Sequence, residues 1–180
     1  MAVGILVACL VGAGESLGAE AVDAAMQAKI DAQLKVVQAW AGDPVIVNAV
    51  KTQNAQTPPA YSAMVQPKWQ ELTILDPFVR SFAKNEVGQF LKAKRTDLIT
   101  QAFVSDAAGL KVGYLDKTAN WTHKGMPKHE VPMTGKTWQG AIELGQASGA
   151  QQIQVAVPVL DGGKPIGSLV VGLGLAKLKE

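Results

Sequence analysis

The chain has 180 residues, of which 48% are hydrophobic and 18% charged, so it can bury one core of ordinary size but not two. Its 17 basic and 15 acidic residues give a net charge of +2 and are scattered along the chain rather than gathered in basic blocks. This pattern excludes the electrostatic footprint of a nucleic-acid-binding protein, and we expect one domain with no nucleic-acid partner.

Residues 1–21 are predicted to form a signal peptide. Residues 2–13 (AVGILVACLVGA) are an unbroken run of apolar and small residues. Such a run is too short to span a bilayer, which needs ~20 apolar residues, but it is typical of the apolar region of a secretory signal. Ala19-Glu20-Ala21 fits an A-x-A pattern, so we expect cleavage after Ala21. No Lys or Arg precedes Lys29, so the basic N-terminal region that is typical of a signal peptide is missing. The alternative is a buried N-terminal helix.

Cys9 is the only cysteine and lies inside this segment, so the cleaved product contains no thiol. That excludes a disulfide framework, a zinc-thiolate site and a cysteine nucleophile. Leu6-Val7-Ala8-Cys9 resembles the lipobox of bacterial lipoproteins, which makes a lipid anchor the alternative to a free product. We predict a periplasmic or secreted bacterial protein whose single domain covers residues 22–180.

The first half of the chain is predicted to be helical. Residues 22–41 contain no Pro or Gly and carry an apolar face at three- and four-residue spacing, formed by Met26, Ile30, Leu34, Val37 and Trp40. Asp43-Pro44 starts a second helix to about Asn54, because Asp is a good N-cap and Pro is tolerated in the first turn. After a loop at 55–60, further helices are expected at 62–72 and, from Asp76-Pro77, through 78–94.

The second half is predicted to be a sheet. We expect strands at 98–104, 110–115, 136–144, 151–160 and 165–175, with an irregular, lysine-rich stretch at 116–135. Gln152, Gln154 and Ala156 alternate with apolar residues, which is the pattern of a sheet with one wet and one dry face. Asp161-Gly162-Gly163-Lys164 is a hairpin turn, and three glycines in the last strand mark either bulges or close helix packing. The order of elements predicts an α+β fold with helices, including that of residues 22–41, on one face of an antiparallel sheet.

Three stretches carry a family resemblance: FVSDAAGLKVGYLDKTANW (103–121), GKTWQGAIELG (135–145) and IQVAVPVLDGGKPIGSLVVGLGLAKL (153–178). Together they resemble the Cache family of extracytoplasmic sensor domains, whose PAS-like core has five antiparallel strands behind a long N-terminal helix. Residues 43–55 (DPVIVNAVKTQNA) are similar to its short, stand-alone members. The resemblance implies that a small polar molecule, such as an amino or organic acid, binds between the sheet and the loop at 116–135.

The loop itself departs from the pattern of many relatives, which have an aromatic-rich, acid-containing stretch of the type S-D-Y-W-Q-G-D-E. This chain has TANWTHKGMP at 118–127, with one aromatic kept, the acids gone and a lysine added. The departure leaves open which ligand is bound, and whether one is bound.

The search for catalytic motifs finds none. His123 and His129 lie six residues apart, without the spacing of an H-E-x-x-H zinc site, and are read as a chance pair in one loop. Gly172-Leu173-Gly174 lacks the third glycine of a dinucleotide fingerprint, and Gly135-Lys136-Thr137 lacks the leading spacing of a phosphate loop. We therefore predict a protein that is not an enzyme and uses no cofactor or metal.

The loop is more informative as a binding surface. Five lysines (Lys111, Lys117, Lys124, Lys128 and Lys136) accompany only two acids there, Asp116 and Glu130. Aromatic area beside a few polar groups is typical of small-molecule sites. The predicted ligand-binding residues are Tyr114, Asp116, Trp121, Lys124, Lys136 and Trp138. A carboxylate is expected on Lys124 or Lys136, with preference for Lys136 because it starts a strand. The alternative is that the lysines are solvated and the tryptophans belong to the core.

These observations predict an exported sensor that binds a small anionic metabolite and signals through a partner protein, such as a membrane receptor. The alternative is a structural or interaction protein that keeps the same scaffold and binds no small molecule.

Overall fold

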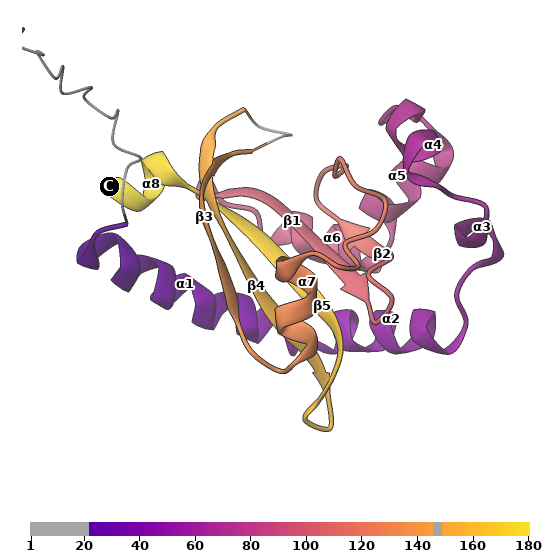
Figure 1. Cartoon of the computed structure of the whole chain (residues 1–180), viewed down its shortest axis with the longest axis horizontal. Helices are drawn as coiled ribbons and strands as arrows, with labels where there is room; N and C mark the ends of the chain where they lie inside the picture. Colours follow the sequence, from indigo (N-terminus) through magenta and orange to yellow (C-terminus); the bar gives the residue numbers. More distant parts are fainter. Residues whose placement is uncertain (1–21, 146–148) are drawn as a thin grey trace, which may run out of the picture.

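The computed structural model describes residues 22–145 and 149–180, which form an α+β fold around one antiparallel sheet (Figure 1). The strand order is β2-β1-β5-β4-β3. The strands are β1 Ile99–Asp106, β2 Lys111–Tyr114, β3 Trp138–Leu144, β4 Gln151–Asp161 and β5 Lys164–Gly174. The helices in this part of the chain are α1 Ala24–Ala41, α2 Pro44–Ala55, α3 Pro59–Ser62, α4 Gln66–Glu71, α5 Pro77–Lys84, α6 Glu86–Ala93, α7 Pro127–Met133 and α8 Leu175–Lys179. The predicted fold class is confirmed.

Aspartate caps start three helices, and the caps at Asp43 and Asp76 lie at the Asp-Pro starts that the sequence predicts. The side chains of Asp23, Asp43 and Asp76 accept hydrogen bonds from first-turn N–H groups of α1, α2 and α5. Such caps satisfy donors that have no partner inside the helix. The predicted helices at 22–41 and 44–54 are therefore confirmed to within two residues.

Two other helix predictions need correction. Residues 78–94 do not form one helix, because Asn85 is extended and its side chain accepts a bond from the Gly88 N–H at 2.8 Å, which caps the separate helix α6. Gly88 packs against the backbone of Ala83 so closely that a Cβ would not fit. The helix expected at 62–72 is replaced by α3 and α4, each of which has a proline, Pro59 or Pro67, in its first turn.

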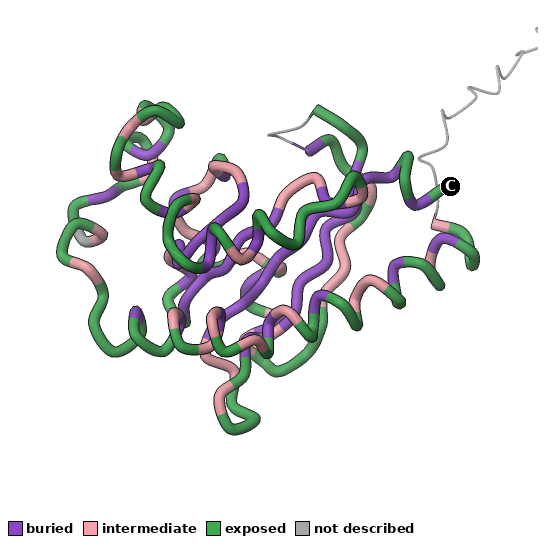
Figure 2. The backbone as a smooth tube through the Cα atoms, turned by 180° about the vertical axis from the view of Figure 1, so that it is seen from behind, coloured by how far each residue is buried: buried purple, intermediate pink, exposed green. Residues whose placement is uncertain are grey.

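All five predicted strands are present, and the central parts of β1, β2, β4 and β5 are buried, whereas the edge strand β3 is half-buried to exposed (Figure 2). β1 and β2 form the predicted antiparallel hairpin. Gly162 and Gly163 supply the positive φ that the turn between β4 and β5 requires. On β4, Ile153, Val155 and Val157 belong to the main core, which lies between one face of the sheet and α1, α2 and α6.

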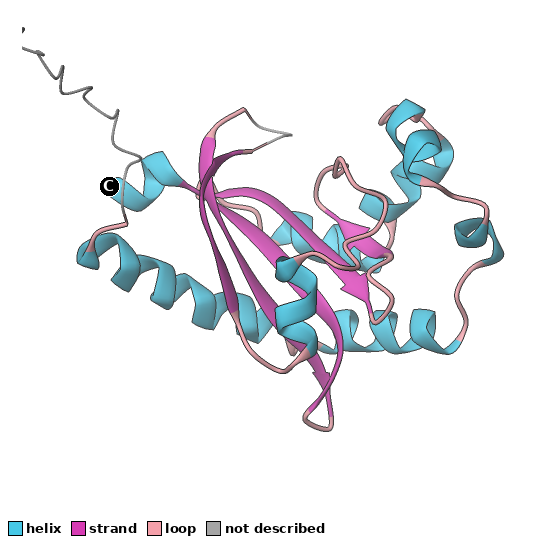
Figure 3. Cartoon of the chain, in the orientation of Figure 1, coloured by secondary structure: helices cyan, strands magenta, loops and turns pink. Residues whose placement is uncertain are grey.

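The opposite face of the sheet is not open to water, contrary to the prediction of a wet face. Gln152 and Gln154 are only 1% and 4% exposed. The reason is a second layer: α7 packs on β5, β4 and β3, within the stretch predicted to be irregular (Figure 3). Helices therefore cover both faces rather than one, and Gln154 of β4 lines a cavity on this second face.

Gly167 on β5 shows why a glycine is needed in the last strand. A Cβ at this position would collide with the Ser105 carbonyl oxygen and approach Val50 Cγ1 of α2 to 2.9 Å. The prediction of close helix packing is confirmed at this residue.

The predicted signal peptide, with Cys9, lies outside the described residues. Within 22–145 and 149–180, none of the helices combines the length and apolar character that crossing a membrane requires.

Candidate ligand-binding site

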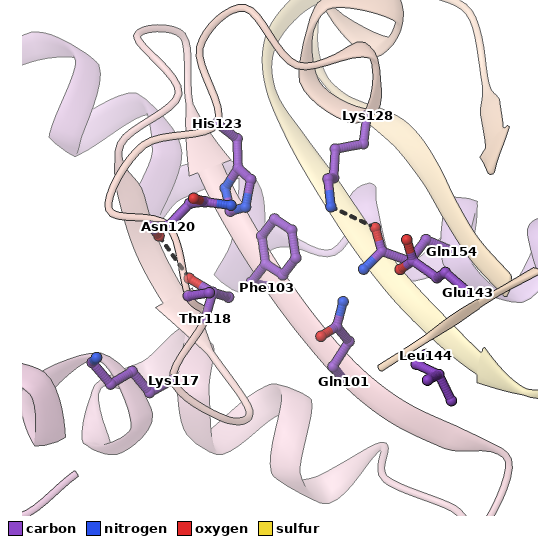
Figure 4. Close-up of a pocket in the computed structure, with 11 residues that line it drawn as sticks. Gln101, Phe103, Lys117, Thr118, Asn120, His123, Lys128, Glu143, Leu144 and Gln154 are labelled. Carbon is purple, nitrogen blue, oxygen red and sulfur yellow. Dashed lines mark hydrogen bonds between the residues drawn. The ribbon is translucent and has the colours of Figure 1, made fainter. Parts of the chain in front are cut away.

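A cavity of about 240 Å³ opens on the face of the sheet opposite α1, beneath the loop that joins β2 to α7 (Figure 4). Strands β1 and β4 provide its floor, the loop and α7 its walls, and β3 its rim. The lining residues are Gln101, Phe103, Lys117, Thr118, Ala119, Asn120, His123, Lys128, Glu143, Leu144 and Gln154. The cavity thus lies between the sheet and the loop, which is the location that the family resemblance implies for a ligand.

The sheet register sets the two glutamines of the floor in one row. Gln101 of β1 and Gln154 of β4 both pair with Gly172 of the intervening strand β5. A side chain at Gly172 would collide with Thr100 and Gln152, which bond to each other across β5. The floor therefore presents amide groups, which can donate or accept hydrogen bonds, from two strands with a glycine between them.

Lys128 brings a cation to the cavity from the first turn of α7. Its Nζ donates to Gln154 Oε1 at 2.7 Å. Burial lowers the pKa of Lys128, and the nearby Glu143 carboxylate opposes that shift. Lys128 forms no ion pair with a described carboxylate. A partly desolvated ammonium group with an amide as its partner is suited to bind the carboxylate group of a ligand.

His123 is buried beside the cavity with its ring fixed by two contacts. The ring stacks on Phe103, with centroids 4.2 Å apart and planes at 14°. Its Nδ1 lies 2.7 Å from Lys111 Nζ. Burial lowers the pKa of His123 to about 2, and the positive charges of Lys111 and Lys128 add to the shift. His123 is therefore neutral at physiological pH and has one N–H donor.

The loop wall is held in place by a buried tryptophan. Trp69 Nε1 donates to the Thr118 carbonyl oxygen at 2.8 Å, and Lys117 Nζ lies 4.8 Å from the centroid of the Trp69 ring. Thr118 Oγ1 in turn donates to the Asn120 carbonyl oxygen at 2.8 Å. These contacts give the loop a defined shape before any ligand arrives.

The aromatic residues predicted to touch a ligand lie next to the cavity rather than in its lining. Tyr114 and Trp121 belong to an aromatic cluster with Tyr61, Trp69, Phe78 and Phe82. Tyr114 Oη donates to the Val79 carbonyl oxygen at 2.5 Å. Trp138, at the start of β3, is half-buried and packs against the hydrophobic cluster that also contains Tyr114 and Trp121.

The predicted charged residues are spread around the loop. Lys124 and Lys136 are exposed, and neither lines the cavity. Asp116 is half-buried, with Oδ2 3.6 Å from Arg95 Nη1. Asp116 and Tyr114 instead line a second hollow of about 200 Å³, beside α5. The structure therefore brings Tyr114 and Asp116 together, and leaves the binding role of all six residues as a prediction.

Several residues that line the cavity are not among the ligand-binding residues predicted from the sequence, although the sequence pattern points to some of them. The alternation that includes Gln154 marked the correct face of β4, and Lys117 and Lys128 belonged to the five loop lysines. His123 was read as half of a chance pair, whereas it is buried and bonded to Lys111. Gln101 and Glu143 left no signal, because only the folded sheet brings them to the loop.

The described residues contain no group of three or more His, Cys, Asp or Glu side chains that could hold a metal ion. His129, the other loop histidine, has its Nδ1 2.8 Å from Ser168 Oγ on β5. The two histidines thus have separate partners.

No protein-family model matches the sequence, and no curated protein shows significant similarity to it. Among solved structures, the sensor domain of the V. cholerae histidine kinase DctB is 20% identical, with a TM-score of 0.50, over 86% of this chain and 54% of that one. The E. coli DcuS sensor domain is 19% identical, with a TM-score of 0.48, over 87% and 96%. The ligand-binding domain of the Pseudomonas fluorescens chemoreceptor CtaA, solved with L-valine, is 14% identical, with a TM-score of 0.46, over 86% and 57%.

This chain therefore spans about half the length of the DctB domain. At such identities the likeness shows the fold alone. The similar structures are Cache-type sensor domains, so the resemblance drawn from the sequence is confirmed at the level of the fold.

Proposed function

We propose that this chain, which has the fold of Cache-type sensor domains, binds a small organic acid or amino acid in the cavity over β1 and β4. The observation that carries the proposal is the set of donors around one enclosed space. Lys128 supplies a partly desolvated cation, His123 supplies a neutral N–H, and Gln101 and Gln154 supply amides. A carboxylate is the ligand group that satisfies such donors best.

The size of the cavity supports a small ligand. Its volume of about 240 Å³ lies below the ~300–1,000 Å³ of sites for drug-sized molecules. Glu143 at the rim adds one acidic group beside Lys128 and Gln154, which would suit the ammonium group of an amino acid (Figure 4). A carboxylate on the exposed Lys124 or Lys136 is the competing arrangement, and the hollow beside Tyr114 and Asp116 is a third.

We further propose that residues 22–180 act outside the cytoplasm as one sensor domain, after removal of residues 1–21, and have no catalytic role. The similar structures are sensor or ligand-binding domains of a histidine kinase and of chemoreceptors, not catalytic domains, which supports this proposal. On this proposal a partner protein, such as a membrane receptor, reads the bound state.

A thermal-shift screen of small carboxylates and amino acids tests the proposal. A ligand present at 100 times its dissociation constant stabilises the fold by about 2.7 kcal/mol. For a chain of this size that corresponds to a rise in melting temperature of roughly 5–10 °C. We expect at least one acid to produce such a rise. If none does, the interaction-protein alternative becomes the better account.

A further inference from the structure

Lys111 on β2 is a lysine with no exposure at all. Its Nζ lies 2.7 Å from His123 Nδ1 and 5.3 Å from the centroid of Phe103. It makes no ion pair with a described carboxylate. A fully buried lysine is costly to desolvate and is rarely kept without a charged partner. Its presence here requires an explanation other than an ion pair.

Asp106, whose charge acts on Lys111, does not provide that partner. Its Oδ1 accepts from the N–H groups of Ala108 and Leu110, both at 2.9 Å, and its Oδ2 accepts from Gln53 Nε2 at 2.8 Å. The Asp106 carboxylate therefore holds the turn after β1 and ties it to α2. Burial lowers the pKa of Lys111 well below its ordinary value, the charge of Lys128 adds to that shift, and the charge of Asp106 opposes it.

Among the described residues, Lys111 Nζ has its hydrogen-bond contact with His123 Nδ1, and it also lies over the Phe103 ring. In its ammonium form, which the charge of Asp106 favours, Lys111 has donors only, and His123 Nδ1 then accepts and carries no hydrogen. In a neutral imidazole the hydrogen then resides on Nε2. Because Nδ1 is taken by Lys111, Nε2 is the ring nitrogen left for a ligand in the cavity that His123 lines.

We propose that Lys111 keeps its ammonium form and is a positioning residue that holds His123 in the Nε2–H tautomer, so that the histidine presents a fixed N–H donor to the ligand. The inference rests on the proposed function only for the identity of the ligand group that accepts the hydrogen bond from His123. Stacking on Phe103 fixes the plane of the ring, and Lys111 fixes which nitrogen carries the hydrogen. The site then selects a ligand with an acceptor at this point, such as a carboxylate oxygen, over one that presents an ammonium or amide N–H.

The tautomer can be read directly in the ligand-free protein. Long-range ¹H–¹⁵N NMR spectra distinguish the two nitrogens of each ring, and the chain has only two histidines, His123 and His129. We expect His123 to be the Nε2–H tautomer in the wild type and to become a mixture in Lys111→Met, in which the stem is kept and the donor is lost. The tautomer of His129 serves as the internal control. Lys35→Met, at an exposed position on α1, controls for the loss of a lysine.

Binding provides the second readout, with the acid identified by the thermal-shift screen. Lys111→Met should weaken binding about tenfold, the effect of one misdirected hydrogen bond. His123→Gln keeps an N–H₂ group near the position of Nε2 without needing a partner at Nδ1. Adding Lys111→Met to His123→Gln should therefore cause no further loss, because Lys111 acts only through the histidine.

The outcomes separate this inference from the proposed function. A wild-type His123 with its hydrogen on Nδ1 would overturn the inference, as would a Lys111→Met variant that keeps the Nε2–H tautomer. Equal losses from Lys111→Met in the wild-type and His123→Gln backgrounds would overturn it too, while leaving acid binding intact. If no acid binds but the tautomer changes as expected, the positioning role stands and the proposed function fails. Melting temperatures of the variants report whether each one folds.

Discussion

Replacing Lys128 with methionine should abolish most of the affinity for an acid while leaving the fold in place. Methionine keeps the apolar stem and removes the ammonium group that donates to Gln154 Oε1 at 2.7 Å. Burial already lowers the pKa of Lys128, which means that its charge is unfavourable in the ligand-free protein. We therefore expect the free energy of unfolding to change by less than about 1 kcal/mol.

The loss of affinity follows from the contact that a carboxylate would make with Lys128. A hydrogen bond to a charged group contributes about 1.5–3 kcal/mol, and each 1.4 kcal/mol is about tenfold in Kd. Lys128→Met should thus weaken binding by roughly 10- to 100-fold. Because binding uses the charged lysine, affinity should also fall as the pH rises through the lowered pKa of Lys128, below the ordinary value of 10.5.

Calorimetric titration with the acid from the screen measures this loss. Lys136→Met is the informative companion, because sequence reasoning favours Lys136 whereas the cavity contains Lys128. Lys35→Met, at an exposed site on α1, controls for the change in net charge. Wild-type affinity in Lys128→Met together with a large loss in Lys136→Met would refute the assignment to the cavity.

Three further predictions concern stability and are measured by urea unfolding. His123 has a folded pKa of about 2, so below its ordinary 6.5 the unfolded chain takes up a proton that the folded protein does not. The free energy of unfolding should therefore fall by about 2 kcal/mol from about pH 7 to about pH 5 in the wild type, and by less in His123→Gln. The same change with pH in both proteins would contradict this. Tyr114→Phe, which removes the hydroxyl that donates to the Val79 carbonyl oxygen, should cost about 0.5–1.5 kcal/mol; no loss would mean that this bond is not formed. Gly167→Ala should cost about 1–3 kcal/mol through its collision with the Ser105 carbonyl oxygen, and a neutral result would mean that β5 and β1 can separate there.

Local chemistry made much of the fold predictable. A helix start or a hairpin turn depends on interactions between residues close in the sequence, so a short motif is enough to predict it. Examples are the helix start at Asp43-Pro44 and the turn at Asp161-Gly162-Gly163-Lys164. Helix α7 was missed because its seven residues include Pro127 and Pro132 and are too few to show an apolar period. The break at Asn85 was missed because its side-chain cap competes with a continuous apolar pattern.

The candidate site was less predictable because its residues converge only in the folded chain. Gln154 was assigned to the polar face of β4, but alternation cannot tell whether water or another layer covers that face. From the sequence, Trp121 could equally be a ligand contact or a residue of the hydrophobic core. Its neighbours in the aromatic cluster, Trp69 and Phe78, come from a distant part of the chain, so only the folded structure shows these contacts. Lys111 resembles the other loop lysines in sequence, and only the structure separates it from them by burial and by its contact with His123.

The central claim is that an acid occupies the cavity over β1 and β4, and a crystal structure of the protein with the acid from the thermal-shift screen tests it most directly. The account predicts the carboxylate within hydrogen-bonding distance of Lys128 Nζ and His123 Nε2, above Gln101 and Gln154. An empty cavity, with the acid bound instead at Lys136 or in the hollow beside Tyr114, would contradict it.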